Sequence, residues 1–143
     1  MKDILIDTNV VLDWLLKREP FLQNAKGVLE PCLRGEINGH LASHTLLNIF
    51  YITRKEKSVA ERKEILLLLS EKFNVIGINK EMITTALKND EWNDLEDGLQ
   101  MQCAAVEKLD GIVTRDSEGF ETSKVPVYSP EAFLEAVKEV SNP

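Results

Sequence analysis

The most constraining feature of the sequence is a short apolar run near its start that ends abruptly in an acid. Ile4–Ile6 is continuous and apolar, as expected for a strand buried on both faces of a parallel sheet. Thr8 or Asn9 is a good N-cap, and apolar residues then recur at helical spacing from Val10 to Leu15. Asp7 therefore stands where a strand ends and a helix begins. In open α/β sheets, ligands bind at that edge.

Size and composition indicate one ordinary globular domain, residues 1–143, with its own core. The net charge of −7 argues against broad electrostatic coating of nucleic acid, which needs a basic face. It leaves room for a local site where bound cations face phosphate. No apolar run reaches membrane-spanning length, and Asp3, Asp7 and Asp13 interrupt any secretory segment. Two isolated cysteines, Cys32 and Cys103, fit buried thiols in a reducing compartment, so we expect a cytoplasmic protein with no membrane partner.

Apolar runs of strand length alternate with helical patterns along the whole chain. Beyond the first strand, we expect strands at Ile37–Ala42, Val75–Ile78, Gly111–Thr114 and Val125–Tyr128. The helices between and after them should begin near Pro20, Ser43, Val59, Lys80, Leu95 and Pro130. This alternation predicts a three-layer α/β/α sandwich with a central parallel sheet. The tail Ser141–Pro143 is expected to fray.

Three acids occupy equivalent points of the predicted fold. Asp7 follows the first strand, Asp116 follows the Gly111–Thr114 strand, and Asp97 lies in the first turn of a helix. If the strands are parallel neighbours, all three converge on the C-terminal edge of the sheet. Carboxylates brought that close repel, and a hard divalent ion with oxygen ligands, Mg²⁺ or Mn²⁺, answers this best. The plain alternative for each acid is a helix cap or a partner of a helix dipole.

Asp97 carries a further indication of burial. The main apolar stripe of its helix lies on another side, yet its i+4 and i+7 neighbours are Met101 and Ala104. An ordinary solvated face is therefore less expected around Asp97. Asp94, three residues earlier, can share the site or cap the helix, and we favour a supporting position for it.

The pattern resembles the PIN domain family. The resemblance rests on the strand ending in Asp7-Thr8-Asn9, on Asp94–Gln100 followed by Ala104-Ala105, and on Ile112–Asp116 with Phe120. It extends over essentially the whole chain. The resemblance implies a metal-dependent ribonuclease on an α/β/α sandwich, often the toxin of a bacterial toxin–antitoxin pair of the VapC type. It further implies that Asp7, Asp97 and Asp116 are the catalytic, metal-binding carboxylates and that Thr8 and Thr114 are their polar supports.

One position departs from the family pattern. The family usually places a Glu on the helix after the second strand, and the corresponding residue here is Asn48. A neutral amide can coordinate through its carbonyl or bind substrate, but it cannot act as a base. The missing charge should weaken metal affinity. Glu96, beside Asp97, is expected to project elsewhere on its helix and, unless the turn is distorted, to be a poor substitute.

The first functional hypothesis is a metal-dependent endoribonuclease. One or two Mg²⁺ (or Mn²⁺) ions would activate water at the scissile phosphate, and Arg115 or Lys55 would steady that phosphate. The resemblance also implies 5′-phosphate and 3′-hydroxyl products, a homodimer and an antitoxin partner. The alternative is a PIN-like module, catalytically weakened at Asn48, that binds RNA or a protein partner. A flavodoxin- or receiver-like domain ranks last, because the chain has no phosphate-cradling Gly-rich loop.

Overall fold

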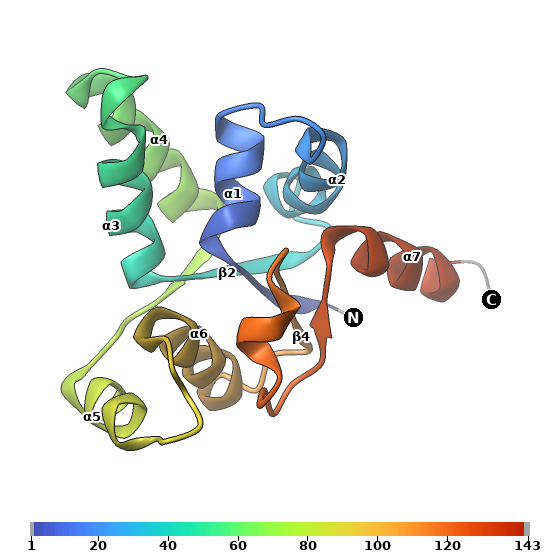
Figure 1. The fold of residues 1–143 in the computed structure, drawn as a ribbon. Coiled ribbons are helices and arrows are strands. Elements are labelled where there is room, and N and C mark those ends of the chain that lie inside the picture. Colours follow the sequence, from blue (N-terminus) through green and yellow to red (C-terminus); the bar gives the residue numbers. More distant parts are fainter. Residues whose placement is uncertain (1, 142–143) are drawn as a thin grey trace.

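The fold is given by a computed structural model in which residues 2–141 are described, so Asn142 and Pro143 of the expected frayed tail lie outside it. The described residues form a five-stranded, all-parallel sheet with the order β3-β2-β1-β4-β5 (Figure 1). The strands are β1 (Asp3–Ile6), β2 (Asn38–Ala42), β3 (Asn74–Ile76), β4 (Gly111–Val113) and β5 (Val127–Tyr128). The predicted central parallel sheet is confirmed, although β3 and β5 are shorter than their apolar runs.

Helices follow the strands in the predicted order. They are α1 (Thr8–Leu15), α2 (Leu22–Leu33), α3 (Ser43–Ile52), α4 (Val59–Lys72), α5 (Lys80–Lys88), α6 (Leu95–Val106) and α7 (Pro130–Ser141), with 3₁₀ turns η1 (Thr53–Lys55) and η2 (Ser117–Phe120). Side-chain caps fix several starts: Ser58 and Glu61 form a reciprocal capping box at α4, and Asn79 accepts from the backbone of Met82 at α5. These caps are local signals, which is why the helix starts were predictable.

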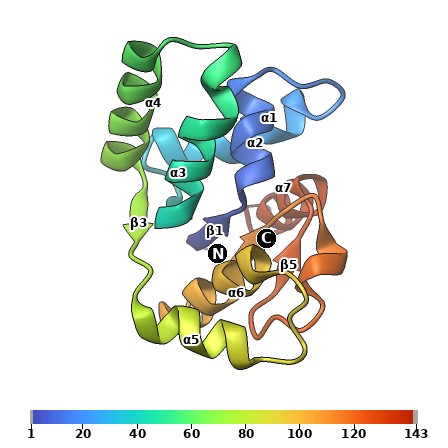
Figure 2. The ribbon, with the colours of Figure 1, turned by 60° about the vertical axis from the view of Figure 1, so that its left-hand side comes forward.

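The sheet separates two hydrophobic cores, and the alternation of side chains along β1 divides them. Ile4 and Ile6 pack into the core under α1, α2, α7 and the α3–α4 pair, whereas Leu5 packs on the opposite face against α5 and α6. Figure 1 and Figure 2 show these helices on the two sides of the sheet. The three-layer α/β/α sandwich predicted from the sequence is therefore confirmed.

Strand order determines which loops meet. The chain steps from β1 outward through β2 and β3, then returns to the other side of β1 with β4. The order thus reverses between β1 and β4, and in open α/β sheets such a switch point opens a crevice at the C-terminal strand ends. Ile6 pairs with Val113, and the backbone N–H of Asp7 donates to the carbonyl of Val113 at 3.0 Å. Asp7 and the residues just after β4 are therefore neighbours.

The apolar residues of α3 do not all face the core, because Leu47 is 70% exposed. The buried side of α3 instead carries Thr45 and Ile49. The expectation that α6 is partly buried on the Asp97 side is confirmed, because Met101 and Ala104 are both buried. Between residues 2 and 141, no helix is long and apolar enough to cross a membrane.

Candidate active site

Asp7 lies at the switch point between β1 and β4, on the C-terminal edge of the sheet, which we call the switch-point edge. Its carboxylate is held from three directions. Its carboxylate Oδ1 accepts from the backbone N–H of Thr8 at 2.8 Å and from the Gln100 amide at 3.3 Å. Oδ2 accepts from the Thr114 hydroxyl at 2.7 Å and from the Asn9 amide at 3.4 Å. Asp7 does cap α1, as expected from the alternative in which each acid is a helix cap. The contacts from α6 and β4 additionally fix a carboxylate that is only 5% exposed.

A buried polar network surrounds this carboxylate. The hydroxyls of Thr8 and Thr45 lie 3.0 Å apart, and the Gln100 amide also donates to Thr45 at 3.0 Å. Gln100 is fully buried, and its Oε1 has no hydrogen-bond partner among the described residues. A buried acceptor without a partner is rare in folded proteins and calls for an explanation. Gln100 and Thr45 were not predicted as site residues, although a Gln between Leu99 and Met101 was a visible signal.

Asp97 and Asp116 approach one another across η2. A Cβ added to Gly119 would lie 3.2 Å from Asp116 Oδ2 and closer than real Cβ atoms ever come to Asp97 Oδ2. Both carboxylates therefore border the same glycine. The Thr114 hydroxyl, which donates to Asp7, also accepts from the backbone N–H of Asp116 at 3.0 Å. The structure thus gathers the three predicted acids at one edge of the sheet, with Thr114 linking two of them.

Asp94 caps α6 by accepting from the backbone N–H of Asp97 at 3.1 Å. It is exposed, and its supporting role at the site stays a prediction.

The expectation for Glu96 was wrong. Its carboxylate does not project away from the site: Oε1 accepts from the Thr8 hydroxyl at 3.5 Å, and the Asn48 side chain also hydrogen-bonds to it. Asn48, on α3, and Glu96, on α6, therefore face each other beside Thr8. The first turn of α6 presents both Glu96 and Asp97 to the edge of the sheet because α6 enters the site by its N-terminus.

Burial and mutual repulsion perturb these acids. Burial, followed by repulsion from Asp94, Asp7, Asp116 and Glu96, raises the pKa of Asp97 to about 7. Burial also raises the pKa of Asp7, and the hydrogen bonds from Thr114 and Thr8 oppose that rise. Between residues 2 and 141, no Lys, Arg or His side chain forms an ion pair with any of these five acids. The negative charge gathered at this edge is therefore uncompensated.

The ligand atoms present suit a hard divalent cation, but the acidic side chains are too far apart to enclose one. Carboxylate, hydroxyl and amide oxygens are the ligands that Mg²⁺ and similar ions prefer, and Gln100 Oε1 adds a buried acceptor with no partner. Within the described part of the chain, however, no three His, Cys, Asp or Glu side chains are close enough together to enclose a metal ion. Closing around an ion would require the Asp97 and Asp116 side chains to move toward the fixed Asp7.

Two other candidates take different positions. The Arg115 guanidinium donates through Nε and Nη2 to the carboxylate of Asp13, which is 1% exposed. Its Cζ lies 3.9 Å from the ring centroid of Phe21. This pairing favours a structural role for Arg115 over the predicted contact with phosphate. Lys55 is exposed at the end of η1, and its predicted role remains untested.

His44, in the first turn of α3, also belongs to the surroundings of Asp7. Both ring nitrogens are buried and have no partner among the described residues. Burial lowers the pKa of His44, and the charge of Asp7 acts in the opposite direction. A neutral imidazole at neutral pH is therefore expected beside the acids.

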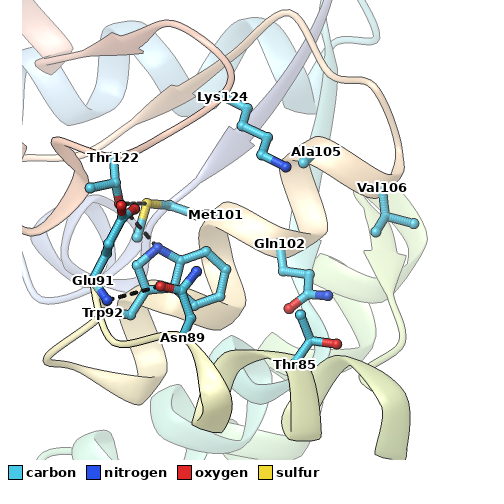
Figure 3. A pocket seen from close by; sticks show the side chains of 10 residues that line it. All are labelled: Thr85, Asn89, Glu91, Trp92, Met101, Gln102, Ala105, Val106, Thr122 and Lys124. Atoms are coloured by element: carbon cyan, nitrogen blue, oxygen red, sulfur yellow. Dashed lines mark hydrogen bonds between the residues drawn. The ribbon is translucent and has the colours of Figure 1, made fainter.

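A separate cavity of about 310 Å³ opens between α5, α6 and the segment after η2 (Figure 3). Trp92, Met101 and Val106 form its apolar wall, and Gln102 and Lys124 are among its polar lining residues. None of Asp7, Asp97 and Asp116 lines it, so this cavity is not the acidic site.

Comparison with known proteins gives a family match and several solved structures of similar fold. The family model described as PIN domain matches residues 3–118, most of its length. No curated protein matches. Among solved structures, FitAB bound to the IR36 DNA fragment has a TM-score of 0.68 and 17% identity over 89% of this chain and 94% of that one.

FitAcB from Neisseria gonorrhoeae has a TM-score of 0.67 and 18% identity, over 90% of this chain and 98% of that one. A toxin–antitoxin complex from Klebsiella pneumoniae has a TM-score of 0.65 and 22% identity, over 89% and 97%. At these sequence identities, the solved structures show a similar fold and nothing further. The match of the family model over residues 3–118 establishes that this chain belongs to the PIN domain family.

Proposed function

We propose that this protein is a metal-dependent endoribonuclease whose catalytic carboxylates are Asp7, Asp97 and Asp116. PIN domains are generally nucleases, and the chain belongs to that family. The observation that carries the proposal is the uncompensated negative charge at the switch-point edge, where the pKa of Asp97 is raised to about 7 by burial and neighbouring acids. Such a site gains most from a divalent cation, which phosphoryl chemistry also needs.

The residues of the site have different roles. Asp7 is a fixed ligand because Thr114, Thr8 and Gln100 hold its oxygens. Asp97 and Asp116 stand at the open side and would complete the coordination of Mg²⁺ or Mn²⁺. When bound, such an ion would polarise a water molecule and neutralise charge on the scissile phosphate. RNA as the substrate follows from the family resemblance.

The direct test is cleavage of single-stranded RNA. Wild type should cleave in the presence of Mg²⁺ or Mn²⁺ and stop in EDTA, leaving 5′-phosphate ends. Asp7→Asn should lose at least about 99% of the rate, because it removes the central charge while keeping the shape. The matched control Asp90→Asn, an exposed acid before α6, should cleave like wild type. Cleavage that persists equally in Asp7→Asn contradicts the proposal.

Partners are part of the same proposal. The Klebsiella pneumoniae structure of similar fold is a toxin–antitoxin complex, and this chain exposes large apolar side chains on α3 and α4 (Leu47, Tyr51 and Leu67 among them). We propose an antitoxin partner and a homodimer for this protein. Light scattering of the purified chain should give the mass of a dimer, and a monomer at micromolar concentration would contradict the homodimer. The cytoplasmic location stays a prediction.

One observation favours the alternative, a PIN-like module that binds RNA or a protein without cutting. In the described residues the acids do not enclose a metal site, and Asn48 carries no charge. This alternative expects RNA binding without cleavage in the same assay, at every Mg²⁺ and Mn²⁺ concentration.

A further inference from the structure

The contacts of Glu96 set it apart from a solvated helix-surface acid. It is half-buried, it accepts from the Thr8 hydroxyl at 3.5 Å, and the Asn48 side chain hydrogen-bonds to it. Thr8 is the residue whose backbone N–H donates to the Asp7 carboxylate. Thr8 therefore links Glu96 to Asp7. Two neutral donors, one from α1 and one from α3, orient the Glu96 carboxylate.

The hydrogen-bond partners of Glu96 are all neutral. They are a hydroxyl and an amide group, and no ion pair to Glu96 exists among the described side chains. A half-buried carboxylate beside other carboxylates, with no cation of its own, is destabilised unless a cation binds.

A second feature belongs to the same buried polar network. Gln100 lies one turn beyond Glu96 on α6, and its amide is bonded to Asp7 and Thr45 while its buried Oε1 remains without a partner among the described residues. Thr45 in turn contacts Thr8, which contacts Glu96. Two side chains from adjacent turns of α6 thus bring oxygen acceptors to the buried network around Asp7.

We propose that Glu96 is a further metal ligand of this site, which supplies from α6 the carboxylate that Asn48 does not carry on α3. This inference rests on the proposed metal-dependent function. Asn48 then has a specific role, because its amide orients the Glu96 carboxylate toward the ion. The acidic side of the site comprises Asp7, Glu96, Asp97 and Asp116, with two of them on consecutive residues of one helix.

The inference is tested by Mn²⁺ binding, measured by calorimetry or electron paramagnetic resonance, with RNA cleavage followed separately. Glu96→Gln keeps the size and hydrogen bonding of the side chain but removes its charge, and it should weaken Mn²⁺ binding by about tenfold or more. Glu107→Gln is the matched control, because it removes one charge about 16 Å further along the axis of the same helix and should bind like wild type. Circular dichroism verifies that each variant is folded.

Moving the carboxylate from α6 to α3 gives the stronger test. Asn48→Glu combined with Glu96→Gln returns a carboxylate to the opposite side of the same contact and should recover Mn²⁺ affinity to within roughly threefold of wild type. If Glu96→Gln does not fold, Glu96→Asp retains the charge with a shorter reach and should weaken binding while Glu107→Asp does not. Mn²⁺ affinity that is the same in Glu96→Gln, Glu107→Gln and wild type overturns the inference.

The outcomes separate this inference from the proposed function. Wild type that binds Mn²⁺ and cleaves RNA while Glu96→Gln binds Mn²⁺ equally well overturns the role of Glu96 alone. Wild type that binds Mn²⁺ through Glu96 but cleaves no RNA supports the role of Glu96 and contradicts the nuclease. Folded wild type that binds no Mn²⁺ overturns both.

Discussion

The hydroxyl of Thr114 donates a 2.7 Å hydrogen bond to the carboxylate of Asp7, although the two residues are 107 positions apart in the chain. The bond joins the ends of β1 and β4 at the point where the strand order reverses. It fixes the Asp7 carboxylate through protein contacts alone, so the fold itself determines the position of this side chain. In the proposed metal site, Asp7 is the fixed ligand, and Asp97 and Asp116 are the ligands that complete the site.

Metal binding should stabilise the folded protein. A ligand that binds only the folded state at a concentration 100 times its Kd adds about 2.7 kcal/mol to the free energy of unfolding. For a chain of this size that corresponds to a rise in Tm of roughly 5–10 °C. Thermal unfolding in EDTA and in increasing Mn²⁺ measures this rise. An equal rise in Asp7→Asn would place the ion somewhere other than this site.

The stability of the metal-free protein should depend on the protonation of Asp97. Its pKa is raised from 3.8 to about 7 in the folded state, so its ionisation destabilises the folded state. The destabilisation is absent below pH 3.8, grows as the pH rises and levels off above about 7. Asp97→Asn removes it. In EDTA, the Tm gain of this variant over wild type should be smallest near about pH 4 and largest near about pH 8, and a gain independent of pH would contradict the assignment.

Gly119 should be required for the arrangement of the two outer acids. A methyl group there would meet Oδ2 of both Asp97 and Asp116, so Gly119→Ala should displace them and weaken Mn²⁺ affinity by about tenfold. Gly77→Ala is the control, because a Cβ at Gly77 meets nothing within 4 Å. Calorimetric titration of the two variants compares them. Unchanged affinity in Gly119→Ala would contradict a requirement for Gly119 in the arrangement of these carboxylates.

Arg115 should matter for stability more than for catalysis. Its guanidinium pairs with Asp13, which is buried, and Arg18 lies 3.9 Å from the same carboxylate. Arg115→Met should lower the free energy of unfolding by about 3 kcal/mol, because it leaves a buried charge with a weaker partner. Below its Tm the variant should still cleave RNA at a rate within about threefold of wild type. A loss of about 100-fold in rate with unchanged stability would restore the predicted contact with phosphate.

What the sequence could predict was local or followed from strand order. Asp7 stands directly after an apolar strand, and Asp94 directly before a helix, so their positions follow from short-range patterns. Parallel neighbouring strands then bring Asp116 to the same edge as Asp7. Glu96 was misjudged because its contacts with Thr8 and Asn48 depend on how α6 is placed against the sheet, and that placement has no signature within the helix itself.

Burial of polar residues was only weakly signalled by the sequence. Thr45 and Gln100 lie fully buried beside Asp7, yet each stands in an ordinary helical stretch. Helical periodicity identifies which residues share a face, but it does not say that a buried face will hold a polar network rather than apolar packing. Hydrogen-bond satisfaction around Asp7 explains both residues only once the fold is known.

A crystal of the wild-type protein grown with Mn²⁺ and measured at the manganese absorption edge tests the central claim most directly. We expect an anomalous difference peak at the C-terminal edge of β1 and β4, bonded to carboxylate oxygens of Asp7, Asp97 and Asp116. Bound Mn²⁺ only elsewhere on the surface, with these carboxylates still apart, would contradict the metal site proposed for this protein.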